Sequence, residues 1–290
     1  MKIGIFGTNY HIEKLNLIKR LLGKLESMDA EVYIDSFFYS FLTEALSYQP
    51  RVKGLITGDC FDLDLALSVG GDGTFLRTAA RINKQDIPIL GINTGRLGFL
   101  ADIGGNELEE TLDEIFKNYY KIEERTQLRL FTEEHLFQGY NYALNEIAIL
   151  KRDTSSMITI HTSIGEDYLT SYQSDGLIIA TPTGSTAYSL SVNGPILVPQ
   201  SNSLVLSPIA PHSLNVRPLV IPDTSVISLT VESRSDFFLV ALDGRSEVFP
   251  AGTVLTVSKA DYTTKVIKRY THTFYQTLRE KLMWGADTRS

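Results

Sequence analysis

The sequence lacks the features that mark secreted and membrane proteins. It contains a single cysteine, Cys60, among 290 residues, so no internal disulfide bond is possible, and a reducing compartment is expected. No apolar run approaches the ~20 residues that span a bilayer. The N-terminal apolar stretch is too short and too interrupted by glycine for a secretory signal peptide. We therefore expect a cytoplasmic protein that does not contact a membrane.

An excess of basic charge is also missing. The chain has 27 Lys and Arg against 34 Asp and Glu, a net charge of −7. Because nucleic-acid-binding proteins usually carry a basic face or domain, nucleic acid is not expected as a partner. Small anionic substrates remain open, since a local basic cluster is enough to bind them. The 43% hydrophobic and 21% charged residues are typical of globular proteins, and the length allows one large domain or two ordinary ones.

The common nucleotide and hydrolase motifs are absent as well. The sequence has no Gly-x-x-x-x-Gly-Lys-Ser/Thr, which excludes a P-loop, and no Gly-x-Gly-x-x-Gly after the first strand, so a standard dinucleotide-binding fold has no support. It also has no Gly-x-Ser-x-Gly elbow of a hydrolase and no Cys/His spacing typical of a metal site. No protein-bound metal is therefore predicted.

The first hundred residues alternate short apolar strands with amphipathic helices, which predicts parallel βαβ units. Period-two alternation from residue 119 onward predicts a β-rich second half. We expect an α/β domain over 1–105, a β-rich domain over 106–270, and a C-terminal helix within 271–290 that packs back on the N-terminal domain. The expected strands of the first half are 2–6, 30–34, 63–69 and 87–93, and the expected helices of the chain are 12–25, 37–46, 74–82, 106–118 and 273–284.

A glycine-rich turn, residues 70–73 (Gly-Gly-Asp-Gly), joins an expected buried strand to an expected helix. Glycine lets a ligand approach the backbone closely, and the free N–H groups at a helix start suit phosphate. Asp72 repels phosphate, so its presence in this turn calls for another role, such as a proton acceptor or a partner for a metal ion. The alternative is an ordinary tight turn with a solvated aspartate.

Three further segments carry polar groups in places where a ligand is plausible. Asn145 and Glu146, expected at the end of a strand, offer groups for an adenine edge or a ribose hydroxyl, or form a simple turn. Residues 174–191 place an aspartate before a buried strand and then a Thr/Ser/Gly-rich turn into Tyr188. That tyrosine either stacks on a flat base or belongs to the core behind a capped helix. Two prolines in residues 207–214 and a third shortly after them, Pro218, fix a rigid loop around His212.

These motifs occur together and in order, and in that combination the chain closely resembles the NAD kinase family (ATP-NAD kinases) in a bacterial-sized version. The resemblance covers about residues 65–250. It implies an N-terminal Rossmann-like α/β domain and a C-terminal β-rich, sandwich-like domain. The motifs are 70–74 (Gly-Gly-Asp-Gly-Thr), 93–100 (Asn-Thr-Gly-Arg-Leu-Gly-Phe-Leu), 145–146 (Asn-Glu), 175–176 (Asp-Gly), 181–188 (Thr-Pro-Thr-Gly-Ser-Thr-Ala-Tyr), 208–212 (Pro-Ile-Ala-Pro-His) and 243–244 (Asp-Gly).

The resemblance implies transfer of the γ-phosphoryl group of ATP to the 2′-hydroxyl of the adenosine ribose of NAD⁺, with Mg²⁺ or another divalent cation carried by ATP. Asp72 would accept the hydroxyl proton or orient the hydroxyl for attack. Gly73 would lie beside phosphate oxygens, and Arg77 would add positive charge to the same rim. NAD⁺ and ATP are thus the expected partners, in a homodimer or homotetramer.

The remaining site residues implied by the resemblance bind the dinucleotide. Asn145 and Glu146 match the pair that contacts NAD, and Asp175 matches the carboxylate that holds a ribose hydroxyl on the nicotinamide side. The residues expected to line the NAD pocket or to approach the ligand are Thr186, Ala187, Tyr188, Ser189, Leu190, Ser191 and Ala210.

Two departures from the family pattern and two rival functions accompany this expectation. Val192 and Asn193 put bulk beside a turn where many relatives have glycine. Arg245 stands where glutamine is frequent and either contacts a phosphate or is solvated. A lipid kinase of the diacylglycerol type shares the glycine–aspartate turn, and a non-catalytic NAD(P) sensor would use the same scaffold without releasing ADP.

Overall fold

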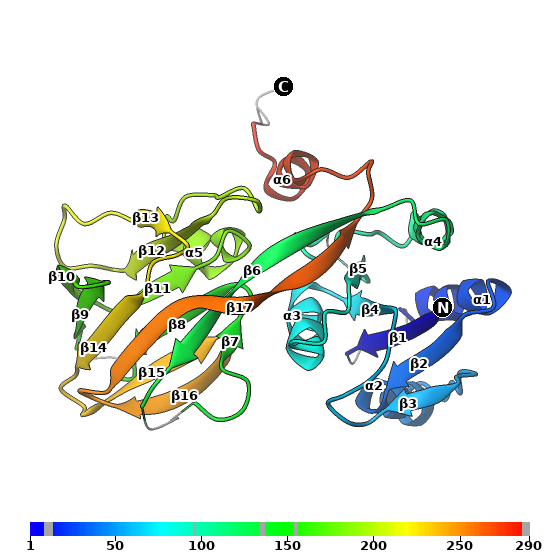
Figure 1. Ribbon diagram of the computed structural model, residues 1–290, viewed down its shortest axis with the longest axis horizontal. Coiled ribbons are helices and arrows are strands. Elements are labelled where there is room, and N and C mark those ends of the chain that lie inside the picture. Colours follow the sequence, from blue (N-terminus) through cyan, green and yellow to red (C-terminus); the bar gives the residue numbers. More distant parts are fainter. Residues whose placement is uncertain (9–13, 96, 134–136, 154–155, 286–290) are drawn as a thin grey trace. The chain divides into compact units, whose positions relative to one another are not determined.

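The computed structural model describes residues 1–8, 14–95, 97–133, 137–153 and 156–285 (Figure 1). The chain divides into two compact units: unit 1 is Met1–Glu124 with Thr264–Ser290, and unit 2 is Arg125–Thr263. Two strands, β6 (Lys121–Phe131) and β17 (Val254–Lys268), run from one unit into the other. The boundary expected at residue 105 falls inside unit 1, and the chain after residue 263 returns to that unit.

Unit 1 extends past residue 105 because α4 (Leu108–Phe116) belongs to its core. Leu108, Leu112 and Ile115 on one face of α4 are buried with the apolar face of α1 (Leu15–Ser27). On their exposed sides the two helices are joined by ion pairs, Arg20 to Glu109 at 2.7 Å and Lys24 to Asp113 at 2.5 Å. Helix α4 thus completes the N-terminal domain instead of opening the next one.

The sheet of unit 1 is parallel and has the strand order β17-β5-β4-β1-β2-β3. The chain moves outward from β1 in one direction through β2 and β3 and in the other through β4 and β5, so β1 and β4 flank the point where the strand order reverses. Ligands of such sheets bind beyond the carboxyl ends of the strands at this point. The strands of this sheet other than β17 are β1 (Lys2–Gly7), β2 (Glu31–Asp35), β3 (Gly54–Ile56), β4 (Leu65–Gly70) and β5 (Ile89–Asn93).

The sequence predicted most of the elements of unit 1. Helix α3 (Asp72–Ile82) follows β4, and α6 (Phe274–Leu282) is the last helix of the described residues, both close to their expected positions. The helix expected over 37–46 consists of α2 (Ser36–Ser40) followed by a π-helical segment, η2 (Phe41–Ala45). The start of the helix expected at residue 12 lies outside the described residues. Strand β3 has only three residues, too few to give a periodic signal.

Unit 2 is a β-sandwich. One sheet has the order β10-β9-β14-β17, with β6 beside β17 and β7 beside β6, and the other has the order β13-β12-β11-β8-β15-β16. The inward-facing residues alternate along each strand, as in Ile147 and Ile149 or Leu177 and Ile179, and form one core between the sheets. The strands are β7 (Tyr142–Ala143), β8 (Glu146–Lys151), β9 (Ile158–Ile164), β10 (Asp167–Ser174), β11 (Gly176–Ala180), β12 (Ser203–Ile209), β13 (Leu219–Pro222), β14 (Ile227–Glu232), β15 (Phe237–Leu242) and β16 (Arg245–Pro250).

The outer face of the second sheet is also covered. Ala148, Ile178, Ala180 and Val205 form a second apolar cluster, against which residues between 190 and 197 pack. The covering residues, Val192 and Leu197, follow η3 (Gly184–Thr186) and the short helix α5 (Tyr188–Ser191) in the chain. Strands β8, β11 and β12 are therefore buried on both faces, which explains why they read as continuous apolar runs.

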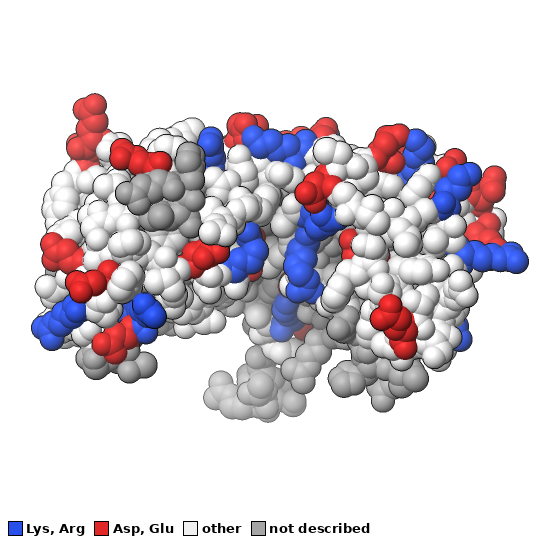
Figure 2. All heavy atoms as spheres, turned by 90° about the horizontal axis from the view of Figure 1, so that it is seen from below, with Lys and Arg blue, Asp and Glu red and all other residues white. Residues whose placement is uncertain are grey.

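The architecture confirms the expected fold class, an N-terminal α/β sheet followed by a β-rich, sandwich-like domain. Among the described residues, no helix is long and apolar enough to cross a membrane. On the face drawn in Figure 2, Lys and Arg side chains lie interspersed with Asp and Glu side chains.

Candidate functional site

The predicted site residues fall into two sets, one in each unit. In unit 1, Asp72 is the first residue of α3 rather than a loop residue, with Gly71 as the N-cap. A carboxylate in the first helical turn is stabilised by the exposed N–H groups and the positive end of the helix dipole. Gly73 and Arg77 follow on the same helix and are exposed, and the Arg77 guanidinium donates to the Thr74 hydroxyl at 3.3 Å.

The Asp72 carboxylate is held by a loop that follows β5. The N–H groups of Phe99, Leu100 and Ala101 each donate to it at 3.0 Å. The loop approaches so closely that a Cβ on Gly98 would lie 2.0 Å from Oδ1 of Asp72. Asp72 is thus only partly exposed, and the alternative of a solvated aspartate in an ordinary turn is wrong.

Close contacts on β5 hold this loop, residues 98–101, in place. Asn93 donates from Nδ2 to the carbonyl of Ala101 at 3.1 Å, and Gly98 N–H donates to the same carbonyl at 3.0 Å. A Cβ on Gly91 would lie 2.5 Å from the carbonyl oxygen of Leu100, so the loop packs directly on the strand. Asn93 and residues 98–100 of the motif noted in the sequence therefore hold the Asp72 carboxylate in place.

The fourth partner of Asp72 comes from the far end of the chain. The Lys281 ammonium of α6 lies 3.2 Å from Oδ2 of Asp72 and 4.7 Å from the centroid of the Phe99 ring. Burial raises the pKa of the Asp72 carboxyl group, but the three backbone donors and Lys281 outweigh burial, so the pKa lies below its ordinary value. Asp72 is therefore an anion at neutral pH.

A cavity of about 390 Å³ in unit 1 opens beyond the carboxyl ends of β1 and β2. Its lining includes two guanidinium groups, Arg77 and Arg81 of α3, and the hydroxyl groups of Thr8, Ser36, Thr57, Thr74 and Thr78. Arg81 is also paired with Asp35, at 3.8 Å, and with Asp59. Cationic and hydroxyl donors at this edge of a parallel sheet have the chemistry that binds phosphate groups.

In unit 2, Asp243 plays a part similar to that of Asp72. Its carboxylate accepts hydrogen bonds from the N–H groups of Leu144 (2.7 Å), Asn145 (2.8 Å) and Glu146 (3.1 Å). Burial raises the pKa of the Asp243 carboxyl group, and these donors only partly offset that effect. Asn145 lies between β7 and β8 and Glu146 is the first residue of β8, whereas the sequence indicated that the pair ends a strand.

The turn 181–188 packs against residues 144–146. Thr181 donates from its N–H to the carbonyl of Asn145 at 2.9 Å, and its hydroxyl donates to the carbonyl of Leu144 at 2.6 Å. A Cβ on Gly184 would lie 2.0 Å from the carbonyl oxygen of Asn145, so only glycine fits there. The backbone N–H of Tyr188 donates to the Glu146 carboxylate. These contacts bring Asn145, Glu146 and Tyr188 together.

Glu146 is a buried carboxyl group. Its side-chain oxygen Oε2 has no hydrogen-bond partner among the described residues. Burial, together with the nearby Asp243, raises the pKa of Glu146 to about 8. A largely protonated carboxyl group at neutral pH presents one O–H donor and one acceptor to a ligand.

The segment 186–191 divides into inward-facing and exposed residues. Tyr188 is 39% exposed, so the alternative of a core tyrosine is wrong. Ser191 is exposed, and Thr186, Ala187 and Leu190 are half-buried. Ser189 differs from them because it is fully buried and its hydroxyl is 2.9 Å from that of Ser207. Its side chain therefore has a packing role.

Asp175 and Ala210 lie at the end of β11 opposite to Asn145, Glu146 and Tyr188. Asp175 donates from its N–H to the carbonyl of Ile209 at 2.9 Å, and its carboxylate lies 2.6 Å from the Lys151 ammonium. Ala210 is exposed and has φ of +44°, a left-handed conformation that is costly for a non-glycine residue. At about 3.3 Å per residue, the length of β11 separates Asp175 from the Glu146 group by about 16 Å.

The Arg245 side chain is not solvated, because contacts within the protein hold its guanidinium group. Its guanidinium donates to the backbone carbonyls of Tyr140 and Tyr142, the latter at 2.6 Å, and lies 5.0 Å from the Tyr140 ring centroid. Burial lowers its pKa from the ordinary value for arginine. The expectation of a solvated side chain is therefore wrong, because two carbonyl groups and two aromatic rings (Phe137 and Tyr140) enclose it.

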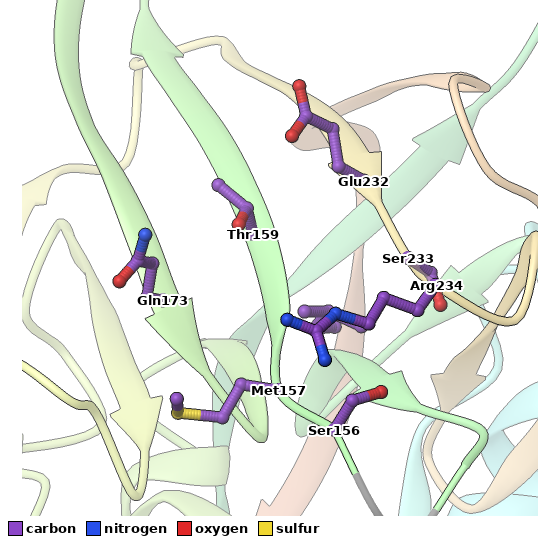
Figure 3. Close-up of a pocket in the computed structure, with 8 residues that line it drawn as sticks. Ser156, Met157, Thr159, Gln173, Glu232, Ser233 and Arg234 are labelled. Atoms are coloured by element: carbon purple, nitrogen blue, oxygen red, sulfur yellow. The ribbon is translucent and has the colours of Figure 1, made fainter.

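A separate cavity of about 580 Å³ in unit 2 contains none of the predicted residues (Figure 3). In Figure 3 the Arg234 guanidinium reaches across it, while the Glu232 carboxylate points the other way. Glu232 meets His161 at 3.0 Å, and His161 in turn meets the hydroxyl of Ser171 at 2.6 Å. Within the described parts of the chain, no group of three or more His, Cys, Asp or Glu residues is arranged to hold a metal ion.

Sequence reasoning identified Asp72 and the 93–100 motif, but it missed Lys281 and the structural role of Asp243. The only local signal for Lys281 is a basic residue in the last turn of a helix, which is common. The contact of Lys281 with Asp72 joins residues 209 positions apart, and no periodicity reports such a pair.

Comparison with known families and structures gives a consistent result. Residues 3–120 match the family model of the ATP-NAD kinase N-terminal domain, and residues 144–269 match that of the ATP-NAD kinase C-terminal domain. The NAD kinase of Bacteroides fragilis is 54% identical over 289 residues, covering 100% of both chains. The NAD kinase of Porphyromonas gingivalis strain W83 is 48% identical over 288 residues, covering 99% of both.

Two solved structures are similar over nearly the whole chain. An NAD kinase from Archaeoglobus fulgidus in complex with ATP aligns with a TM-score of 0.74 at 25% identity, covering 98% of both chains. Yeast NADH kinase complexed with NADH aligns with a TM-score of 0.88 over 100% of this chain and 89% of that chain. At 23% identity the yeast enzyme supports the fold alone.

Proposed function

The chain belongs to the ATP-NAD kinase family, and from that membership we propose that it transfers the γ-phosphoryl group of ATP to NAD⁺. The acceptor is the 2′-hydroxyl of the adenosine ribose, and the products are NADP⁺ and ADP. The hydroxyl oxygen forms a bond to the γ-phosphorus as the bond from that phosphorus to the β,γ-bridging oxygen breaks. The hydroxyl proton leaves to the Asp72 carboxylate or through it to water.

The observation that carries the proposal is the Asp72 carboxylate, held at the N-terminus of α3 by three backbone N–H groups. Its pKa lies below the ordinary value, so it is a weak base but a firmly oriented hydrogen-bond acceptor. Phosphoryl transfer through a loose transition state needs the nucleophile aligned more than fully deprotonated. We therefore assign Asp72 mainly the orientation of the 2′-hydroxyl, which contributes through positioning.

The cavity beside Arg77 and Arg81 supports a site for the donor phosphates. Guanidinium groups and the N-terminus of α3 would neutralise charge on the transferring group, with Gly73 leaving the backbone accessible. We assign Mg²⁺, or another divalent cation, to the ATP phosphates as part of the substrate. The Archaeoglobus fulgidus NAD kinase, whose structure is in complex with ATP, is consistent with this donor.

The unit 2 residues supply a set of groups suited to the acceptor dinucleotide. The Asn145 amide and the Glu146 carboxyl group, with Tyr188 exposed beside them, match the polar edge and flat face of an adenosine. Asp175, about 16 Å along β11, is placed in our proposal on the nicotinamide ribose, with Ala210 nearby. Thr186, Ala187, Leu190 and Ser191 complete the proposed lining, whereas Ser189 supports it from the core.

Three expectations remain predictions: a cytoplasmic location, a homodimer or homotetramer, and the identity of the divalent cation. The comparisons give no support to the two rival functions, a lipid kinase and a non-catalytic sensor. The range of phosphoryl donors is left to experiment.

The test is a coupled assay of the purified protein. The protein is incubated with NAD⁺, Mg²⁺ and ATP, another nucleoside triphosphate or polyphosphate, and an NADP⁺-specific dehydrogenase reports the product. We expect NADP⁺ to form with ATP in step with ADP. Binding of NAD⁺ without release of ADP would indicate a sensor, and transfer of label to phospholipid vesicles but not to NAD⁺ would indicate a lipid kinase.

A further inference from the structure

Every acceptor position of the Asp72 carboxylate is filled in this structure. Oδ1 accepts from the N–H groups of Leu100 and Ala101, and Oδ2 accepts from the N–H of Phe99 and from the Lys281 ammonium. An ionised carboxylate offers about four lone-pair positions. A substrate hydroxyl can therefore donate to Asp72 only if one of these four donors leaves.

The four donors differ in how firmly they are held. The three backbone donors belong to the 98–101 loop, which is tied to β5 through Asn93 and packs against Gly91. The Lys281 ammonium stands at the end of a flexible side chain, 31% exposed, and its 3.2 Å contact is the longest of the four. Lys281 is thus the donor that a ligand can replace.

Helix α6, which carries Lys281, is attached to unit 1 by its own contacts. Just before the helix, Arg269 contacts Glu114 at 2.6 Å and Glu110 at 3.0 Å, and His272 contacts Glu107 at 2.8 Å. Thr273 caps the helix by accepting from the N–H of Gln276 at 3.2 Å. The helix therefore stays in place when the lysine side chain moves.

The side of α6 that faces the 98–101 loop is also packed. The Phe274 ring lies 6.1 Å from the Phe99 ring, and Thr277 and Leu278 are buried. The Phe99 ring thus contacts both ends of α6, Phe274 at its start and Lys281 in its last turn. These contacts fix the reach of the Lys281 side chain toward Asp72.

We infer that Lys281 is a positioning residue of the active site, a displaceable partner that holds Asp72 as an anion and occupies the acceptor position taken by the 2′-hydroxyl when NAD⁺ binds. The inference rests on the proposed function. On binding, the hydroxyl replaces the ammonium at Oδ2. The displaced ammonium stays near the N-terminus of α3, where the incoming phosphate groups bring negative charge.

The other charged groups around Asp72 have partners or directions of their own. Arg77, on the same helix, donates to Thr74. Asp102 and Lys268, beyond the 98–101 loop, form a buried ion pair at 2.6 Å. On α6, Glu280 lines a cavity together with Glu107 and His272. Among the described residues, Lys281 is therefore the cation whose removal is expected to change the ionisation of Asp72.

The test replaces Lys281 by methionine, which keeps the length of the side chain and removes its charge. The matched control is Arg279→Met, because Arg279 is exposed on the same turn of α6. Lys281→Arg is the conservative variant. Each protein is assayed for NADP⁺ formation from about pH 3 to about pH 8, because the pKa of Asp72 lies below its ordinary value, and the titration of the Asp72 carboxyl group is followed by NMR over the same range in the absence of substrates.

In Lys281→Met we expect the Asp72 titration and the acid limb of kcat/KM to move up by about half to one pH unit, because the ammonium is gone. The KM for NAD⁺ is expected to fall about two- to fivefold, the size expected when no partly exposed ion pair has to be displaced. Arg279→Met should match the wild type in both respects, and Lys281→Arg should retain the wild-type acid limb.

The outcomes distinguish failure of the proposed function from failure of the inference about Lys281. A wild-type protein that forms no NADP⁺ refutes the proposed function, whereas the NMR titration still reports on the Lys281–Asp72 contact. A wild-type enzyme that is active, with a Lys281→Met variant whose Asp72 titration, acid limb and KM all match it, overturns the inference. Equal shifts in Lys281→Met and Arg279→Met would also overturn it, because they would reflect only the charge of α6.

Discussion

Replacing Gly98 by alanine is expected to disable the site with one methyl group. The added Cβ would lie 2.0 Å from Oδ1 of Asp72 and 2.9 Å from the carbonyl oxygen of Ala101. Ordinary contacts of a Cβ begin near 3.4 Å. The carboxylate or the loop therefore has to move by more than 1 Å.

Movement of the carboxylate is costly here, because four donors hold it in place. We expect Gly98→Ala to lower the free energy of unfolding by about 1–3 kcal/mol, typical of an overpacked site. A displacement of about 1 Å at a group that aligns a nucleophile costs about 10²-fold in rate. The turnover for NADP⁺ formation should therefore fall by about that factor while most of the protein stays folded at 25 °C.

The measurements are steady-state kinetics with ATP and NAD⁺ and urea unfolding followed by circular dichroism. Gly104→Ala is the matched control, because its Cβ would meet its nearest neighbour, Oε2 of Glu107, at an ordinary 3.4 Å. Wild-type turnover in Gly98→Ala would refute the reasoning, since it would show that Asp72 need not be held where this loop holds it.

Three further predictions concern buried ionisable groups. The pKa of Glu146 is about 8 in the folded protein and 4.5 ordinarily, so the stabilisation linked to its proton is full below pH 4.5 and is lost as the pH rises through about 8. Glu146→Gln should therefore reduce the decrease in the free energy of unfolding with pH, measured by urea unfolding. A pH dependence equal to that of the wild type would contradict the raised pKa. Arg245→Leu leaves two backbone carbonyls without their donor, so the free energy of unfolding should drop by about 1–3 kcal/mol, and an unaltered melting temperature would argue against that role. Lys268→Met leaves the Asp102 carboxylate buried without its cation and should lower the free energy of unfolding by about 3–5 kcal/mol. Lys265→Met removes a more exposed ion pair and should lower it by less than about 1 kcal/mol. Equal losses in the two variants would contradict the difference in burial assigned to the two pairs.

Hydrophobic periodicity in the sequence predicted most of the helices and strands, because their formation depends mainly on neighbouring residues. The alternation of strands and helices in the first hundred residues and the period-two strands after residue 119 led to the observed fold class. The glycine turn at the end of β4 was placed correctly because its chemistry is confined to residues 70–73. The limits of unit 1 were not predicted, since the amphipathic pattern of α4 does not reveal which core its apolar face joins.

The parts that could not be predicted depend on contacts between distant residues. Asp243 holds the N–H groups of residues 144–146, almost a hundred positions away, and Lys281 reaches Asp72 across 209 positions. Arg245 was expected in solvent or on a phosphate because the sequence gives no sign of the carbonyl groups that enclose it. A single sequence reports propensity and period, whereas these contacts are set by the packing of whole elements.

The most direct test of the central claim, that Asp72 orients the 2′-hydroxyl for phosphoryl transfer, is the turnover of Asp72→Asn at saturating ATP and NAD⁺. Asparagine is nearly the same size and keeps one oxygen for the N–H groups of Leu100 and Ala101, so the protein should fold with a somewhat lower melting temperature. The account predicts that kcat for NADP⁺ formation falls by about 10²–10⁴-fold, while calorimetry finds NAD⁺ bound with nearly unchanged affinity. Turnover close to that of the wild type would contradict it.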